Sequence, residues 1–138
     1  MFGTILLAVD GSPHADRAVD LARTVASSGG DEILVVHVTE MLVGRAPGPV
    51  ELDGDREAIE RAKQHAKELE AAGVPARVEL VRAQAGHVAK VIAELASERD
   101  AGLIVMGSRG RTDLAALVLG SVAHKVLHLS DRPVLIAR

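Results

Sequence analysis

The chain has 138 residues, which suits one compact domain with a single hydrophobic core. A formal charge of −3 excludes the general positive field that gathers nucleic acid. The one aromatic residue, Phe2, cannot supply the stacking platforms of single-strand binders. Because the chain has no cysteine, disulfides, zinc–thiolate sites and thiol catalysis are excluded as well.

The sequence also argues against a membrane protein. Its aliphatic runs are far shorter than the ~20 residues that a membrane-spanning helix needs. The apolar run at the N-terminus lacks a basic start and is interrupted by Asp10, so it does not resemble a signal peptide. We therefore expect a cytoplasmic protein that binds neither nucleic acid nor membrane.

The first predicted strand is Thr4–Val9, a nearly continuous aliphatic run of the kind found in strands buried on both faces. A helix follows it, with Ser12 as the expected N-cap and Pro13 at the first helical position. Apolar residues then recur at helical spacing until Gly29-Gly30, which ends the helix. The second predicted strand, Ile33–Val38, comes next.

Residues 40–54 interrupt this alternation, because they are rich in Gly and Pro and have no clear period. A connection of that length is uncommon in a compact domain, and we expect it to be functional or mobile. After it the sequence predicts a helix from about Asp55 to Ala72, a strand at Ala76–Val81, a helix over 88–96 and a strand at Leu103–Met106.

The last predicted elements are a helix from Ser121 towards His128 and a strand at Pro133–Ala137. Strands and helices thus alternate along the whole chain, which predicts an α/β fold with one domain over residues 1–138. We expect an open, five-stranded parallel sheet, and we take 3-2-1-4-5 as its strand order. Right-handed crossovers should place helices on both of its faces.

The strongest motif follows the fourth predicted strand and reads Gly107-Ser-Arg-Gly110, nine residues, then Gly120-Ser121. Glycine lets backbone N–H groups approach a ligand closely. Gly120-Ser121 immediately precedes a helix, whose free N–H groups and dipole favour an anion, and Arg109 adds positive charge. The pattern predicts a phosphate site, the alternative being glycines that only turn the chain. It is neither a Walker loop nor the dinucleotide fingerprint.

Asp10 is the second candidate, at the end of the first predicted strand. In open parallel sheets ligands bind beyond the carboxyl ends of the strands, where the strand order reverses. In the order 3-2-1-4-5 this point lies between the first and fourth strands, which places Asp10 beside Gly107. A carboxylate there can hold ribose hydroxyls or a phosphate-bound Mg²⁺. Alternatively, Asp10 bonds only its own turn.

The histidines predict no catalytic or metal site. His124 and His128 have the i, i+4 spacing of a metal pair, but no third ligand lies near them in sequence, so we expect surface histidines. His14 is expected on the surface of the first helix, without a partnered nucleophile. His37, inside a buried strand, is expected to be a hydrogen-bonded core or cleft residue.

These motifs resemble the nucleotide-binding branch of the universal stress protein family. The first strand and turn are similar in Thr4-Ile-Leu-Leu-Ala-Val-Asp10-Gly-Ser12, and the last strand in Arg132-Pro-Val-Leu-Ile136. The segments Leu103-Ile-Val-Met-Gly-Ser-Arg-Gly110 and Leu119-Gly-Ser-Val-Ala123 resemble the family pattern Gly-x2-Gly-x9-Gly-Ser/Thr. The resemblance covers essentially the whole chain.

The resemblance implies a Rossmann-like domain that binds ATP with Mg²⁺. It implies adenine at the backbone of Val38 and the ribose near Ala8, Val9 and Asp10. It implies the phosphates near Gly107, Gly110, Gly120, Ser121 and Val122. Met106 and Arg109 are also expected among the nucleotide-binding residues. It also implies a homodimer formed through the final strand, at Val134, Leu135 and Ile136, and an apolar edge strand needs such covering.

We therefore expect an ATP-binding, dimeric sensor or regulator in the stress response, whose nucleotide shifts its affinity for a protein partner. A slow ATPase or autophosphorylating enzyme is an alternative. Arg109, Lys125 and Asp10 supply parts of a phosphoryl-transfer site, but no residue that orients the attacking group is evident. A nucleotide-independent adaptor is a further alternative, and the residues do not rank ATP against AMP or a cyclic nucleotide.

Overall fold

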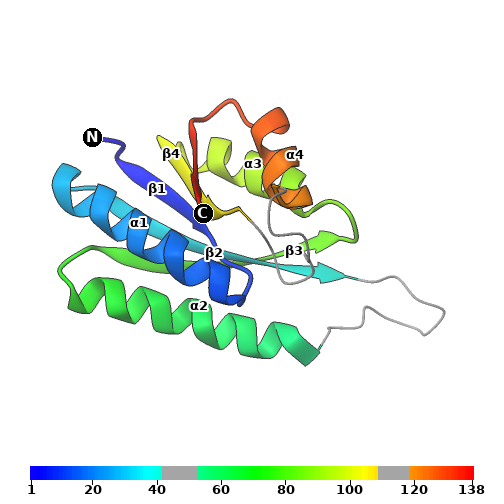
Figure 1. Cartoon of the computed structure of the whole chain (residues 1–138), viewed down its shortest axis with the longest axis horizontal. Coiled ribbons are helices and arrows are strands. Elements are labelled where there is room, and N and C mark those ends of the chain that lie inside the picture. The colour runs from blue at the N-terminus through cyan, green and yellow to red at the C-terminus, as the bar shows by residue number, and fades with distance from the viewer. Residues whose placement is uncertain (42–52, 109–118) are drawn as a thin grey trace.

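The computed structural model describes residues 1–41, 53–108 and 119–138, and these contain one five-stranded sheet in the order β3-β2-β1-β4-β5 (Figure 1). All four neighbouring pairs of strands are parallel. The strands are β1 (Thr4–Ala8), β2 (Glu32–Met41), β3 (Ala76–Gln84), β4 (Leu103–Gly107) and β5 (Val134–Ala137). The predicted fold class and strand order are confirmed.

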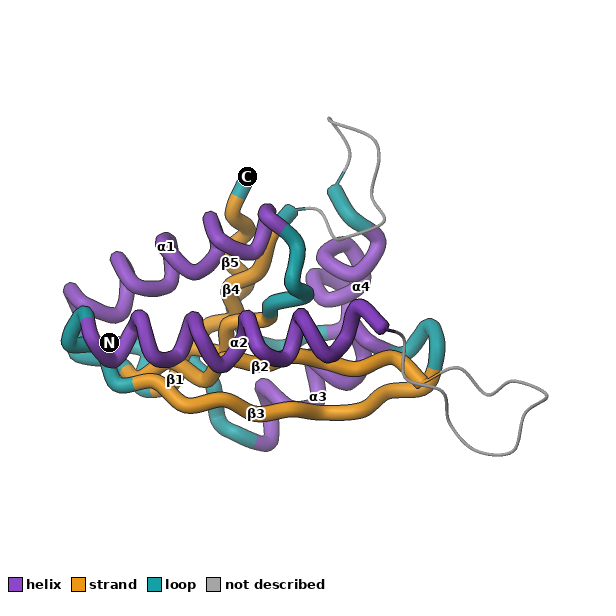
Figure 2. Tube along the Cα trace, turned by 90° about the horizontal axis from the view of Figure 1, so that it is seen from below, coloured by secondary structure: helices purple, strands orange, loops and turns teal. Residues whose placement is uncertain are grey.

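Helices cover both faces of the sheet (Figure 2). They are α1 (Pro13–Gly29), α2 (Asp53–Ala71), α3 (Val88–Glu98) and α4 (Ser121–Leu129). Helices α1 and α2 pack on one face and α3 and α4 on the other, so that two separate apolar clusters form with the sheet between them. In the described ranges, no helix combines the length and apolar character that crossing a membrane requires.

The central strands are buried on both sides, as their aliphatic runs predict. Ile5, Leu6 and Leu7 of β1 are all 0% exposed. Leu6 packs under α3 and α4, while its two neighbours pack under α1 and α2, because successive side chains of a strand point to opposite faces. Because β1 is the central strand, its C-terminal end and the turn that follows it lie at the middle of the carboxyl-terminal edge of the sheet.

Strands β2 and β3 extend three residues beyond the predicted ends. The extra register pairs are Thr39↔Arg82, Glu40↔Ala83 and Met41↔Gln84. Polar residues interrupt the aliphatic run there, but the backbone ladder between the two strands continues, since its hydrogen bonds do not depend on the side chains. The strand boundaries predicted from hydrophobicity are therefore too short, and Glu40 lies in a strand rather than in a loop.

The start of α1 is predicted correctly in position but not in its contacts. Ser12 is the N-cap residue with extended backbone angles, φ −79° and ψ 159°, and Pro13 begins the helix. The Ser12 side chain, however, makes no capping hydrogen bond. Instead the Ser12 backbone N–H donates to Oδ1 of Asp10 at 2.9 Å, so the carboxylate closes the turn that leads into the helix.

Asp31 connects the N-terminal residues to the turn between α1 and β2. Its Oδ1 accepts hydrogen bonds from the Met1 ammonium at 2.6 Å, from Phe2 N at 2.7 Å and from Gly3 N at 2.8 Å. The bond from the ammonium, followed by those from the Gly3 and Phe2 backbone, holds the pKa of Asp31 below its usual value, although burial opposes this. The carboxylate is therefore held in its ionised form.

We expect Asp31→Asn to lower the free energy of unfolding at pH 7 by about 1–2 kcal/mol, because it removes a charged acceptor of three hydrogen bonds. A folded-state pKa below the unfolded one contributes stability above the unfolded pKa, about 3.9 for Asp, and this is lost as the pH falls through the folded pKa. Urea unfolding at pH 7 and at pH 3 should show a smaller pH-dependent loss in the variant.

The control for this prediction is Asp20→Asn. Asp20 is 72% exposed and pairs with Arg23 across one helical turn at 3.4 Å, so its removal should change the unfolding free energy little at either pH. Equal pH dependence in the wild-type chain and in Asp31→Asn would contradict the role given to Asp31.

Candidate functional site

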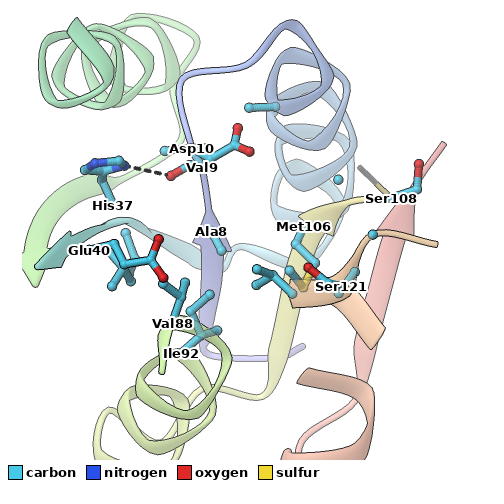
Figure 3. A pocket seen from close by; sticks show the side chains of 17 residues that line it. Ala8, Val9, Asp10, His37, Glu40, Val88, Ile92, Met106, Ser108 and Ser121 are labelled. Atoms are coloured by element: carbon cyan, nitrogen blue, oxygen red, sulfur yellow. Dashed lines mark hydrogen bonds between the residues drawn. The ribbon is translucent and has the colours of Figure 1, made fainter. Parts of the chain in front are cut away.

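A cavity of about 180 Å³ opens where β1, β2 and β4 end and where α3 and α4 begin (Figure 3). Strand β1 lies between β2 and β4 in the sheet. The connection that follows β1 leads to β2 on one side, and the connection that follows β4 leads to β5 on the other side. The position is the one at which open parallel sheets bind ligands, because the connections diverge and leave a crevice at the carboxyl ends of the strands.

Most of the cavity wall is apolar. The side chains come from the ends of three strands and from the first turns of two helices: Ala8, Val36, Val38, Val88, Ile92, Met106 and Val122. Such a wall suits the flat, uncharged part of a small ligand, which gains by leaving water.

One end of the cavity is the N-terminus of α4. Gly120 is the N-cap residue, and no side chain of the described residues caps this helix. Gly120, Ser121, Val122 and Ala123 all line the cavity. Because the first backbone N–H groups of a helix lack partners within it and the helix dipole is positive at this end, the arrangement favours an anionic group.

The other side of the cavity carries two carboxylates. Figure 3 shows Asp10 after β1 and Glu40 near the end of β2, on either side of Ala8. Oδ1 of Asp10 closes the turn with Ser12, and Oε1 of Glu40 accepts a hydrogen bond from Gly86 N at 2.8 Å. A carboxylate has a second oxygen that can accept from a ligand hydroxyl or amino group, so this side favours hydrogen-bond donors.

Residues 1–138 match the model of the Universal stress protein family. The chain belongs to the universal stress protein family. The "Universal stress protein in QAH/OAS sulfhydrylase 3'region" of Thermus aquaticus is 40% identical over 139 residues, and the match covers 100% of both chains.

Solved universal stress proteins have the same fold. A universal stress protein structure from Archaeoglobus fulgidus is similar with a TM-score of 0.79 and 26% identity, over 100% of both chains. A universal stress protein solved in complex with cAMP is similar with a TM-score of 0.73 and 27% identity, over 99% of this chain and 97% of that one. Family membership thus applies to the whole chain.

In this universal stress protein the fold brings nine of the predicted site residues to one cavity. Its lining includes Ala8, Val9, Asp10, Val38, Met106, Gly107, Gly120, Ser121 and Val122. Arg109 and Gly110 lie outside the described residues, as do 42–52 of the predicted long connection. Val134, Leu135 and Ile136 do not line the cavity but lie in β5, at an edge of the sheet.

Eight further residues line the cavity and were not among the predicted site residues: Ala15, Val36, His37, Glu40, Val88, Ile92, Ser108 and Ala123. Glu40 follows Val38 by two residues, so it lies on the same face of β2, a signal that the early predicted strand end concealed. Val88 and Ile92 are four residues apart at the start of α3, which places both on one side of that helix.

The histidines take different positions. His124 and His128 lie on the exposed side of α4 with their ring centroids 4.6 Å apart in an edge-on contact. His37 is 1% exposed and hydrogen-bonded through both ring nitrogens, which confirms that it is a partnered core or cleft residue.

Proposed function

We propose that the chain is an adenine-nucleotide-binding regulator in the stress response, and that its ligand is ATP bound with Mg²⁺. The proposal depends mainly on one observation. A single cavity has an anion-favouring helix N-terminus at one end, two carboxylates on the other side and an apolar wall between them. A nucleotide has the complementary parts: phosphates, hydroxyl and amino donors, and a flat base.

The residues of the cavity divide accordingly. We assign the phosphates to Gly107 and to the first turn of α4, the ribose to Asp10, and the base to the apolar wall beside the Val38 backbone. The related protein solved with cAMP supports an adenine nucleotide as the ligand class. Asp10 is also the residue of the cavity best suited to a phosphate-bound Mg²⁺, since Mg²⁺ prefers carboxylate oxygens and keeps several waters.

We propose a cytoplasmic homodimer in which the nucleotide changes the affinity for a protein partner. β5 pairs only with β4 in the described sheet, and the exposed Leu127 and Leu129 lie on α4, which contacts β5. An apolar sheet edge is commonly covered by pairing with a second copy. A monomeric mass in sedimentation equilibrium would contradict this part of the proposal.

The composition makes the first test simple. Because the chain has no Trp, Tyr or Cys, the pure protein absorbs almost nothing at 280 nm, and a bound nucleotide would produce a clear band at 260 nm. We expect about one adenine nucleotide per chain after heat precipitation, identified by anion exchange with mass detection, or about 1:1 binding in calorimetry.

The calorimetry should compare ATP, AMP and cAMP, each with and without Mg²⁺. Tighter binding of ATP only when Mg²⁺ is present would support the proposed ligand. Absence of binding for all three would contradict the proposed function and favour a nucleotide-independent adaptor. Single-turnover measurement with labelled ATP separates the regulator from the alternative of a slow ATPase or autophosphorylating enzyme, which would release or retain labelled phosphate.

A further inference from the structure

His37 lines the cavity and lies at the centre of a buried polar contact. Its Nδ1 is 3.1 Å from the carbonyl oxygen of Val9, a contact drawn in Figure 3, and its Nε2 is 3.3 Å from Oδ1 of Asp55. Both His37 and Asp55 are 1% exposed. The ring therefore connects three elements: the turn after β1, strand β2 and the first turn of α2.

The chemistry of the three groups decides where the protons lie. A carbonyl oxygen only accepts, so Nδ1 of His37 must carry a hydrogen and donate it to Val9. Nε2 faces a carboxyl oxygen, and without a proton between them two lone pairs would meet. One proton is therefore shared by His37 and Asp55, on the ring or on the carboxyl group. Either arrangement makes the contact between β2 and α2 attractive.

A second contact joins the same helix to the same turn. Gly11 has φ +82°, and a Cβ built on it would lie 2.8 Å from Cβ of Ala58 and 3.0 Å from its Cα. Asp55 and Ala58 are three residues apart, so they lie on one side of α2. The turn at 9–12 is thus held by α2 at two points, through Val9 by way of His37 and through Gly11 directly.

Helix α2 holds this turn from outside the cavity lining, as far as its described side chains show. Of residues 55–71, none lines the cavity, whereas Val9 and Asp10 of the turn do. A displacement of the first turn of α2 would therefore alter the cavity in two ways, by moving the turn at 9–12 and by moving His37. Coupling between two sites is reciprocal. If an ordered α2 favours ligand binding at the turn, bound ligand must stabilise the first turns of α2 by the same free energy.

We propose that His37 and Asp55 are positioning residues of the cavity, which set the turn at 9–12 and couple its occupation to the first turns of α2. The part of this proposal that concerns a nucleotide rests on the proposed function. The part that concerns the turn is independent of any ligand, and the two are tested separately.

The variant that tests the coupling is Asp55→Ala, which leaves the His37–Val9 hydrogen bond possible but removes the link to α2. We expect it to weaken nucleotide binding about 10-fold, within the range typical of coupled sites, whereas Asp55→Asn should stay within about 2-fold. The asparagine amide can donate to Nε2 of a neutral ring, so this conservative variant keeps the hydrogen bond.

Leu69→Ala is the matched control. Leu69 is 1% exposed and packs in the apolar cluster between the sheet and helices α1 and α2. It lies on the same helix as Asp55 but near the other end. Its truncation lowers stability by about 2–5 kcal/mol and should leave the affinity of the folded protein unchanged. If Leu69→Ala weakens binding as much as Asp55→Ala does, or Asp55→Asn as much as Asp55→Ala, the positioning role is overturned.

Hydrogen exchange supplies a measurement that needs no ligand. In the ligand-free protein, Asp55→Ala should speed exchange of the Ser12 amide, and Leu69→Ala should not. Unchanged exchange at Ser12 in Asp55→Ala would overturn the proposal even if nucleotide binds. If the wild-type chain binds no nucleotide but Ser12 responds, the proposed function fails and the positioning role stands.

The wild-type protein gives a further readout if Asp55→Ala does not fold. Saturating nucleotide should slow exchange in residues 57–61 of α2 as well as at 9–12, while residues 66–71 stay unchanged. Protection confined to the residues that line the cavity would contradict coupling to α2.

Discussion

We expect Gly120→Val to weaken ATP binding by at least about 100-fold, equivalent to about 2.7 kcal/mol, while the protein stays folded. Gly120 lines the cavity at the N-terminus of α4, next to the N–H groups of Ser121 and Val122. A branched side chain there occupies space that a phosphate needs to reach these groups. The backbone angles, φ −59° and ψ 153°, are ones that valine adopts readily, so the change does not strain the backbone at this position.

The measurement is calorimetry with ATP and Mg²⁺, beside thermal unfolding of the same samples. Gly120→Ala is the matched control, because one methyl group blocks less space and should give an intermediate affinity. Full ATP affinity in Gly120→Val would contradict the assignment of the phosphates to this helix N-terminus. Lost affinity together with a large loss of stability would show that Gly120 is structural.

The second large effect is expected from Gly11→Ala, which should lower the free energy of unfolding by about 2–5 kcal/mol. Part of this is the strain of an alanine at φ +82°, about 1–2 kcal/mol. The rest, about 1–3 kcal/mol, comes from overpacking, because the new Cβ would lie 2.8 Å from Cβ of Ala58 and α2 would have to move.

Gly73→Ala separates these two causes. Gly73 has a similar φ of +85°, but a Cβ added there meets nothing within 4 Å. We therefore expect this variant to lose only the strain, about 1–2 kcal/mol. Urea unfolding of both variants measures the difference. Equal losses would mean that α2 yields to the new methyl group, and would remove the contact between Gly11 and Ala58 as a constraint on the turn.

Local patterns in the sequence determined much of the fold. The alternation of aliphatic runs and helical periods predicted five strands and four helices, and all of these form. The positions of Asp10 and Gly107 at strand ends, together with the helix start at Gly120, predicted that they would meet. This prediction is possible because parallel strands of an open sheet bring their carboxyl ends to one edge.

The element boundaries and the contacts of single side chains were less predictable. Of the last three residues of β2, Thr39 is buried while Glu40 and Met41 are half-buried, and two of the three are polar. Hydrophobicity therefore ended this strand at Val38, although pairing with β3 carries it to Met41. Ser12 was expected to cap α1 with its side chain, but Asp10 closes that turn. Several short polar residues compete for the same backbone groups, and the geometry of the turn decides among them.

The sequence by itself determined the fold class, because the types of the elements follow from periodicity. The glycines at fixed spacing indicated the phosphate end of the cavity, and the resemblance to the universal stress protein family supplied the other predicted site residues. Only the tertiary structure decided that His37 contacts Asp55, that Gly11 meets Ala58 and that Asp31 binds the N-terminal residues. These pairs are 18 to 47 residues apart and leave no periodic signal. Their contacts depend on how closely α2 and the chain ends pack against the sheet.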